Sequence, residues 1–189
     1  MGAALGWFST TIEMGPGDVP LRETTVLATV SRRFGPDIGV DVGAGAIVGG
    51  QAGDHDGEVS AGFAASAAAT WLARYEGERS PFVLVGGSLA GSRAEAVSDD
   101  GESYALGAFD LRVGAMVGKT TGPVTLYGAA RVFGGPVSWT LAGEETTGGD
   151  AHHYTVGAGA TVRAGRFSLA LEGMALGERS VTAGVGLGL

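Results

Sequence analysis

The most regular feature of this chain is an alternation of apolar residues with small or polar residues at a period of two. In 38–49 the even positions are all apolar, whereas the odd positions are mostly glycine. Segments 59–71, 154–163 and 180–189 alternate in the same way. This period is typical of a β-strand whose two faces meet different surroundings. We therefore expect a strand in each of these four segments.

Weaker copies of the pattern fill the rest of the chain, and together they predict ten strands. They cover 104–118, 123–133, 167–176, 3–13, 22–34 and 82–92. Eight strands is the alternative, if 3–13 or 167–176 is misassigned. The alanine-rich stretch 61–74 also suits a helix by intrinsic propensity. We prefer a strand there, because its neighbours share its length and its alternation.

Long and short connections take turns along the chain. The long ones are 14–21, 50–57, 93–103 and 134–152, and the short ones are 35–37, 75–81, 119–122, 164–166 and 177–179. Several short connections have the Gly, Pro and Asp content of tight turns. This order predicts antiparallel up-and-down strands, with turns at one end and longer loops at the other.

The two faces of the predicted sheet indicate which face points inward. One face is continuously apolar, and the other is mostly Gly, Ala, Ser and Thr with scattered charges. A soluble barrel needs large apolar side chains inside, whereas a narrow transmembrane barrel has the inverse arrangement and must close in lipid. We therefore predict an all-β fold, a closed antiparallel up-and-down transmembrane β-barrel that forms one domain over 1–189. A soluble β-barrel carrier is an alternative that these faces contradict.

Composition and charge narrow the function classes further. Of the 189 residues 36 are glycine, which leaves space inside a narrow lumen. The absence of cysteine excludes disulfides and thiolate metal sites. The net charge of −8 argues against nucleic acid as a partner. No apolar run is long enough for a transmembrane helix.

The charges are also divided between the two predicted ends. More than half of the 20 acidic residues lie in or beside the long connections, namely Asp18, Asp54, Asp56, Glu58, Glu95, Asp99, Asp100, Glu102, Glu144, Glu145 and Asp150. Basic residues gather near the short turns, namely Arg32, Arg33, Arg74, Arg79, Lys119 and Arg166. Aromatic residues partly mark two interfacial belts, with Phe34, Trp71, Tyr75 and Phe167 near the turns and Tyr104 and Tyr154 near the loops.

The C-terminal residues carry a resemblance to a known family. Thr182 to Leu189 matches the pattern polar-x-Gly-x-x-hydrophobic-x-hydrophobic. With the alternation, this makes the chain similar to the small bacterial outer-membrane β-barrel proteins, although Leu189 stands where members usually have Phe or another aromatic residue.

The resemblance implies an even strand number and both termini on the periplasmic side. It also implies a bacterial outer-membrane location, with the lipid bilayer and lipopolysaccharide as surroundings. Thr182 to Leu189 would be read by the barrel insertion machinery, and we expect a monomer. Gly-Ala-Ala-Leu-Gly-Trp follows Met1 directly, so we expect either a mature form without a signal peptide or a cytosolic protein.

Charged residues on the small-residue face are candidates for a polar network in the lumen. They are Asp41, Arg74, Asp110, Arg112, Arg131, Arg163 and Glu172. Buried charges must pair or be solvated, and about ten strands is near the size that side chains can fill. We interpret the set as a structural ion-pair network, with a selective pore as the alternative.

Enzymatic and metal sites are less well supported. His153, Thr155 and Glu172 resemble the His, Ser and acid set of barrel lipid A acylhydrolases, but the His-x-Ser spacing of that group is absent. We therefore interpret His152 and His153 as polar residues at a loop–strand junction. The carboxylate clusters 54–58 and 99–102 lack EF-hand spacing, so we expect solvated acidic loops and neither a metal nor a cofactor.

The sequence as a whole therefore predicts a non-enzymatic outer-membrane barrel with a structural or surface-binding and adhesion role through acidic extracellular loops. A narrow pore for ions or small solutes, a barrel-embedded lipid hydrolase and a soluble carrier are the alternatives.

Overall fold

The computed structural model describes residues 1–14, 17–53, 57–97, 103–141 and 144–188. Within these ranges the chain forms twelve strands. They are β1 (Gly2–Met14), β2 (Gly17–Phe34), β3 (Ile38–Ala52), β4 (Gly57–Arg74), β5 (Phe82–Val97), β6 (Ser103–Thr121), β7 (Val124–Gly134), β8 (Pro136–Leu141), β9 (Glu144–Asp150), β10 (Tyr154–Ala164), β11 (Phe167–Ala175) and β12 (Arg179–Leu187). No helix in this part of the chain is long and apolar enough to cross a membrane.

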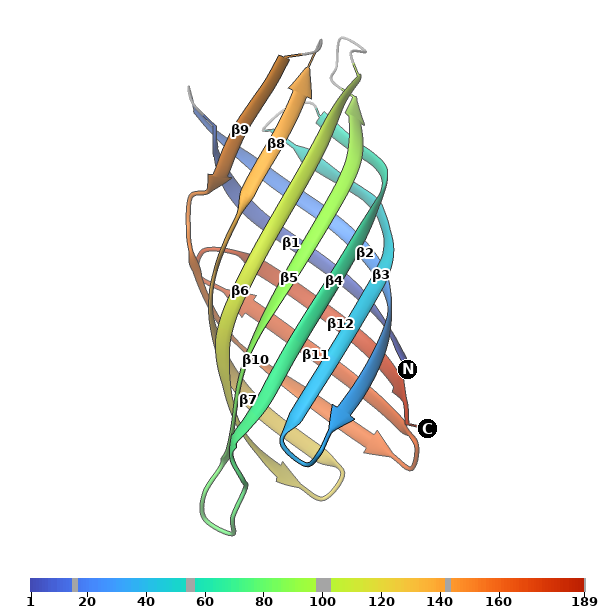
Figure 1. The fold of residues 1–189 in the computed structure, drawn as a ribbon, viewed down its shortest axis with the longest axis vertical. Coiled ribbons are helices and arrows are strands. Elements are labelled where there is room, and N and C mark those ends of the chain that lie inside the picture. Colours follow the sequence, from blue (N-terminus) through green and yellow to red (C-terminus); the bar gives the residue numbers. More distant parts are fainter. Residues whose placement is uncertain (15–16, 54–56, 98–102, 142–143, 189) are drawn as a thin grey trace.

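Ten of these strands form a closed antiparallel ring (Figure 1). The order is β1 to β7, then β10, β11 and β12, and β12 pairs with β1 from Gly2 opposite Gly186 to Ser9 opposite Arg179. The predicted ten-stranded up-and-down architecture is confirmed. Gly35, Gly122 and Gly165 make the tight turns at one end, where their positive φ angles suit glycine. We call this end the turn end and the opposite end the loop end.

The expected loop 134–152 contains a hairpin instead. β8 pairs with β6 and β9 pairs with β1, beyond the ends of β7, β10, β11 and β12. The ring therefore has ten strands at the turn end but eight near the loop end, namely β1 to β6 with β8 and β9. The hairpin escaped the sequence analysis because β8 has only six residues, too few for a clear alternation, and β9 has no apolar residue.

The other expected long connections are mostly strand as well. β1 reaches Met14 and β2 starts at Gly17, and β5 and β6 similarly occupy both sides of the expected loop 93–103. Asp18, Glu58 and Glu95 consequently lie on strands. The reason is that backbone pairing continues beyond the apolar alternation, since each unpaired N–H or C=O group would need another partner.

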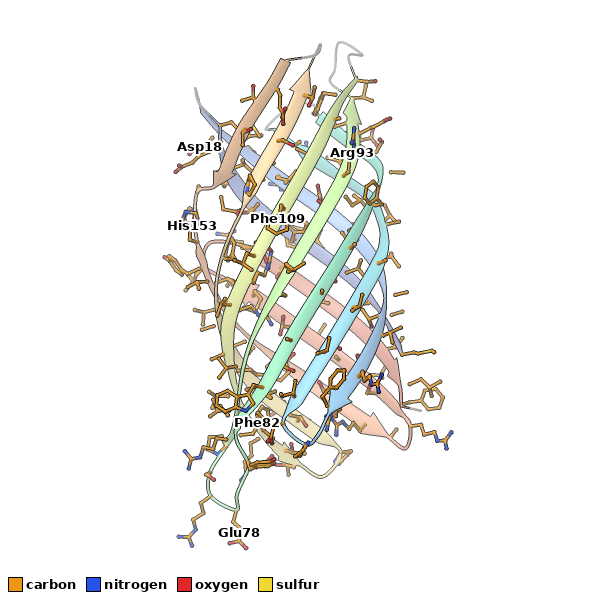
Figure 2. The ribbon with its side chains drawn as sticks, viewed as in Figure 1. Asp18, Glu78, Phe82, Arg93, Phe109 and His153 are labelled. Atoms are coloured by element: carbon orange, nitrogen blue, oxygen red, sulfur yellow. The ribbon has the colours of Figure 1, made fainter. Side chains whose placement is uncertain are left out.

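Large apolar side chains cover the outside of the ring. Those more than two-fifths exposed include Leu5, Val26, Val30, Val42, Phe63, Trp71, Leu89, Phe109, Leu111, Val113, Leu126, Val132, Val156, Leu169, Leu171 and Val185. Inward residues such as Gly43, Ile47 and Met174 are buried. The outward apolar face predicted from the alternation is therefore observed, and Figure 2 shows side chains pointing away from the barrel wall around its length.

A compact apolar cluster fills the eight-stranded section, which the sequence analysis did not anticipate. It contains Ile12, Met14, Leu21, Ile47, Ala52, Val59, Ala94, Ala96, Tyr104, Leu106 and Val137. Tyr104, expected in an interfacial belt, is buried and stacks on Trp139 of β8 with ring centroids 4.3 Å apart. Eight strands leave an interior that side chains just fill, so this cluster closes the loop end of the lumen.

Candidate functional site

The ten-stranded section contains a charged lumen, and one ion pair in it joins β7 to β11 across β10. The two Nη atoms of Arg131 donate to the two Oε atoms of Glu172, each at 2.8 Å. Tyr127 Oη donates to Glu172 Oε2 at 3.2 Å. Gly159 of β10 lies between Tyr127 and Glu172 in the register, and a Cβ atom there would be 2.4 Å from the tyrosine ring. The glycine therefore makes room for this contact.

A second ion pair joins β6 to the turn between β11 and β12. Arg112 Nη1 and Nη2 donate to Glu178 Oε1 and Oε2 at 2.8 and 2.5 Å, and Arg112 Nε donates to Asp110. The guanidinium also lies over the Phe133 ring, 5.2 Å from its centroid. The Glu178 side chain is only 4% exposed, so the turn is anchored inside the barrel. A bidentate pair in a partly buried site is stronger than an exposed one.

Thr155 of β10 holds the backbone of this turn through its hydroxyl group. Its hydroxyl is fully buried and lies within hydrogen-bond distance of the carbonyl oxygens of Ala175 and Glu178, at 3.2 and 3.0 Å. Leu176 and Gly177 have positive φ angles, which bend the chain inward between the two strands. The turn therefore places a carboxylate in the lumen that a simple exposed hairpin would have left in solvent.

Two cavities flank these ion pairs. One of about 300 Å³ lies between the apolar cluster and the two arginines, and one of about 240 Å³ is lined by small residues of β4 and β5. Arg112 and Arg131 line both. The larger cavity is also lined by Glu23, Asp110, Asp150, Glu172 and Glu178, so its acidic groups outnumber its basic groups.

The structure brings together four of the seven predicted network residues, Asp110, Arg112, Arg131 and Glu172. The other three lie elsewhere: Asp41 accepts a hydrogen bond from Ser31, and Arg74 and Arg163 are exposed at the turn-end tips of β4 and β10. The predicted membership of these three in the network is therefore wrong. Arg74 and Arg163 lie at the ends of their strands, where a long side chain reaches water, and Asp41 bonds locally to Ser31 on the neighbouring strand.

Sequence reasoning missed Glu178, Glu23, Tyr127 and Asp150. Tyr127 lies on the small-residue face of the predicted strand 123–133, so the alternation could have found it. Glu178 lies in a connection, and no strand pattern predicts that a connection points inward.

The residues of the hydrolase alternative are not assembled. The Thr155 hydroxyl is buried against two carbonyl groups, and Glu172 is bound to Arg131 and Tyr127. His153 is exposed beside Gly134 on the side of the barrel (Figure 2). A nucleophile must lie within hydrogen-bond reach of its base, and none of the hydrogen bonds found among the described residues joins His153 to either group.

The described residues contain no group of three or more potential metal ligands. Asp54, His55 and Asp56, together with Asp99, Asp100 and Glu102 of the second carboxylate cluster, lie outside the described residues.

A second polar cluster braces the turn end, at the connection 75–81. Thr120 N–H donates to both Oε atoms of Glu76 at 3.0 and 3.2 Å, and Lys119 Nζ donates to the carbonyls of Gly77 and Glu78. The Thr120 amide holds the pKa of Glu76 below its ordinary value, with a smaller contribution from Lys119. The hydrogen bond to Asp37 raises the pKa of Tyr75. Figure 2 shows Glu78 at the tip of this connection, at the other end of the barrel from Asp18 and Arg93.

Comparison with solved structures identifies similar folds. The translocator domain of the autotransporter NalP from Neisseria meningitidis matches with a TM-score of 0.59 and 13% identity, over 100% of this chain and 87% of that chain. The transport unit of the autotransporter AIDA-I from Escherichia coli gives 0.46 and 9%, over 100% and 90%. The beta domain of the Bordetella autotransporter Brka gives 0.42 and 14%, over 100% and 99%.

Neither a protein-family model nor a curated protein sequence matches the chain. The likeness to the NalP translocator domain supports the β-barrel fold alone. The site is therefore interpreted from its own residues.

Proposed function

We propose that this chain is an integral β-barrel of a Gram-negative outer membrane, without enzymatic activity, which has a structural or surface-binding role at its loop end. The observation that carries this proposal is the apolar outer face of a closed ring that encloses two ion pairs. A soluble protein rarely exposes so much contiguous apolar surface, whereas a transmembrane barrel requires it.

Closure of the ring supports the same proposal. Each of the ten strands pairs with a neighbour on both sides, so the main part of the sheet has no open edge. A sheet in lipid must satisfy its backbone groups internally. The fold likeness to the NalP translocator domain agrees with a membrane barrel of this kind. A transport role is disfavoured, because ion pairs and an apolar cluster occupy the lumen.

The partners follow from the surroundings of such a barrel. They are the lipid bilayer, lipopolysaccharide at the outer face, and the insertion machinery through Thr182 to Leu189, of which Leu189 lies outside the described residues. β12 supports the last of these, because its pairing with β1 closes the ring. We expect a monomer, since the ring closes within one chain.

The surface-binding role is assigned to the loop end. There the β8–β9 hairpin extends the wall, and Glu145, Thr146 and Thr147 are exposed on it. The opposite end carries tight turns and a basic set that includes Arg32, Arg33 and Arg166. This difference supports an outward loop end and a periplasmic turn end.

Membrane insertion is tested by heat-modifiable migration. Purified protein refolded in detergent or lipid vesicles should migrate differently on a gel before and after boiling, and it should precipitate when detergent is removed without lipid. Full solubility of folded protein without detergent would contradict the proposal.

Orientation is tested with cysteine labelling, which the natural absence of cysteine makes clean. In intact cells an impermeant maleimide should label Glu145→Cys and leave Arg79→Cys unlabelled until the cells are opened. The reverse result would place the turn end outside.

The surface role is tested on cells that display the chain. Such cells should adhere more than cells without it to wells coated with matrix protein. Replacement of Glu145 and Thr146 by lysine should reduce that adhesion, whereas Arg79→Lys at the other end should not. Equal adhesion with and without the chain would contradict the surface-binding role and leave only the structural role.

A further inference from the structure

The larger lumen cavity lies between two different walls. On the loop-end side it contacts members of the apolar cluster, including Ile12, Leu21 and Val137. On the other side it contacts the groups of both ion pairs. Its volume of about 300 Å³ is at the lower end of the range found for small-molecule sites. The cavity therefore combines an apolar half with a charged half.

The charges of this cavity do not balance within the described residues. Glu172 is matched by Arg131, and Glu178 is matched by Arg112. Asp110 shares Arg112 with Glu178, and Glu23 and Asp150, on the same cavity, have no ion pair among the described residues. If all five carboxylates are ionised, two arginines leave an excess of three negative charges.

Glu23 is the least satisfied of these groups. Glu23 is only 3% exposed and lines the cavity. Among the described residues, no hydrogen bond or ion pair to its carboxylate is found. Its neighbours in the register are Phe8 on β1 and Gly50 on β3, which offer no side-chain donor. Among the described residues, Asp110 Oδ1 is also buried without a partner, and the Asp150 side chain accepts only from the Thr10 hydroxyl, at 3.2 Å.

An unpaired buried carboxylate costs free energy, which a bound cation would recover. A metal ion needs several ligands gathered at one point, and the described residues contain no such group. An ammonium group needs only one carboxylate within hydrogen-bond distance to form a charge-assisted pair, and the apolar half of the cavity suits a hydrocarbon tail.

We propose that the larger lumen cavity binds a small organic cation, a primary amine with a short alkyl or aromatic body. Its ammonium group is held by Glu23, the negative charges of Asp150 and Asp110 on the same cavity add attraction, and its body packs against Phe8, Ile12 and Leu21. The inference depends on the fold alone and goes beyond the surface role proposed above.

Calorimetry on the folded barrel in detergent tests this inference with probes of matched shape. Benzylammonium, benzyl alcohol and benzoate differ mainly in charge, and 1,4-diaminobutane supplies an alkyl amine. Benzylammonium or diaminobutane should bind saturably and more tightly than the alcohol, and benzoate should not bind. The inference is overturned if neither amine binds, or if the alcohol or benzoate binds as tightly as benzylammonium.

Two variants locate the site. Glu23→Gln should weaken amine binding by about ten- to hundredfold, because a charged hydrogen-bond acceptor becomes neutral. Its matched control is Glu13→Gln, which changes an exposed glutamate on the neighbouring strand and should leave binding unchanged. Ser66→Leu should fill the cavity and abolish binding of every probe. Unchanged binding in Glu23→Gln overturns the assignment.

Each variant is first checked for folding by its gel migration before and after boiling. If Glu23→Gln does not fold, Asp150→Asn together with the discrimination between amine, alcohol and benzoate by the unchanged chain decides the question.

Discussion

Gly159 illustrates how single residues determine the shape of the lumen. It lies opposite Tyr127 on one side and Glu172 on the other. The sequence analysis predicted that glycine on this face leaves room for larger side chains of other strands, and here the tyrosine ring occupies the space that a Cβ atom would need. The alternation predicts which face the glycine lies on, but the identity of the side chain that fills the gap depends on the register.

Gly159→Ala should therefore destabilise the barrel. The added methyl group would meet the Tyr127 ring at 2.4 Å and the Leu171 carbonyl oxygen at 2.8 Å, and such overpacking costs about 1–3 kcal/mol. Urea unfolding from lipid vesicles measures the change. Gly173→Ala is the matched control, since its Cβ meets nothing within 4 Å. Equal stability of the two variants would show that Tyr127 moves aside without cost.

Glu76 provides a prediction of pH dependence at the turn end. Hydrogen bonding from the Thr120 amide lowers its pKa in the folded state, so its stabilising contribution is present above the unfolded pKa and is lost as the pH falls through the lower folded value. The Thr120 amide resonance should therefore shift with a midpoint below the ordinary value of 4.5. NMR of the barrel in micelles follows this resonance.

The shift should disappear in Glu76→Gln and persist in Glu78→Gln, because of these two residues only Glu76 accepts from Thr120 through its side chain. A titration of Thr120 that survives in Glu76→Gln would assign it to another group.

At the scale of elements, the strands were predictable and the way they end was not. All ten segments with period-two alternation are strands of the ring, because one face of each contacts the outside over its whole length. β8 has the alternation over only six residues, with Val137 and Trp139 turned toward the apolar cluster, and β9 has no apolar residue. Their position follows from pairing with β6 and β1, which lie far away in the sequence.

The turn between β11 and β12 behaves as part of the lumen because of Glu178. Without Glu178, Arg112 keeps only Asp110 as a partner and its two Nη atoms lose theirs, so Glu178→Ala should destabilise the barrel by about 1–3 kcal/mol. Thermal gel-shift curves or urea unfolding measure this loss. Arg163→Ala removes an exposed charge and should change stability by less than about 0.5 kcal/mol. If Glu178→Ala loses no more stability than Arg163→Ala, the ion pair between Arg112 and Glu178 does not stabilise the barrel.

At the scale of the whole molecule, the change from ten strands to eight divides the lumen. The wider section holds charges and cavities, and the narrower section holds the apolar cluster. The ion pairs of Arg112 and Arg131 and the apolar cluster follow one another along the barrel axis. A solute that crosses the barrel would have to pass both.

We therefore expect no steady conductance from the unchanged chain in planar bilayers. Arg112→Ala should also remain closed, because the cluster around Leu21 and Leu106 still fills the loop-end section. The measurement is single-channel recording across a range of voltages, with the detergent buffer alone as the control. A stable ohmic conductance would support the pore alternative over the closed barrel.

The sequence by itself determined the local and repetitive properties of this protein. The period of two determined the strands and the apolar outer face, because every strand position contacts either the lumen or the outside. The glycine turns determined the hairpins at one end. The eight-stranded section, the pairing of Arg112 with Glu178 and the isolation of Glu23 follow from the three-dimensional fold and not from any local pattern. These depend on side chains brought together from distant strands, and their register and inward direction follow from closure of the whole ring.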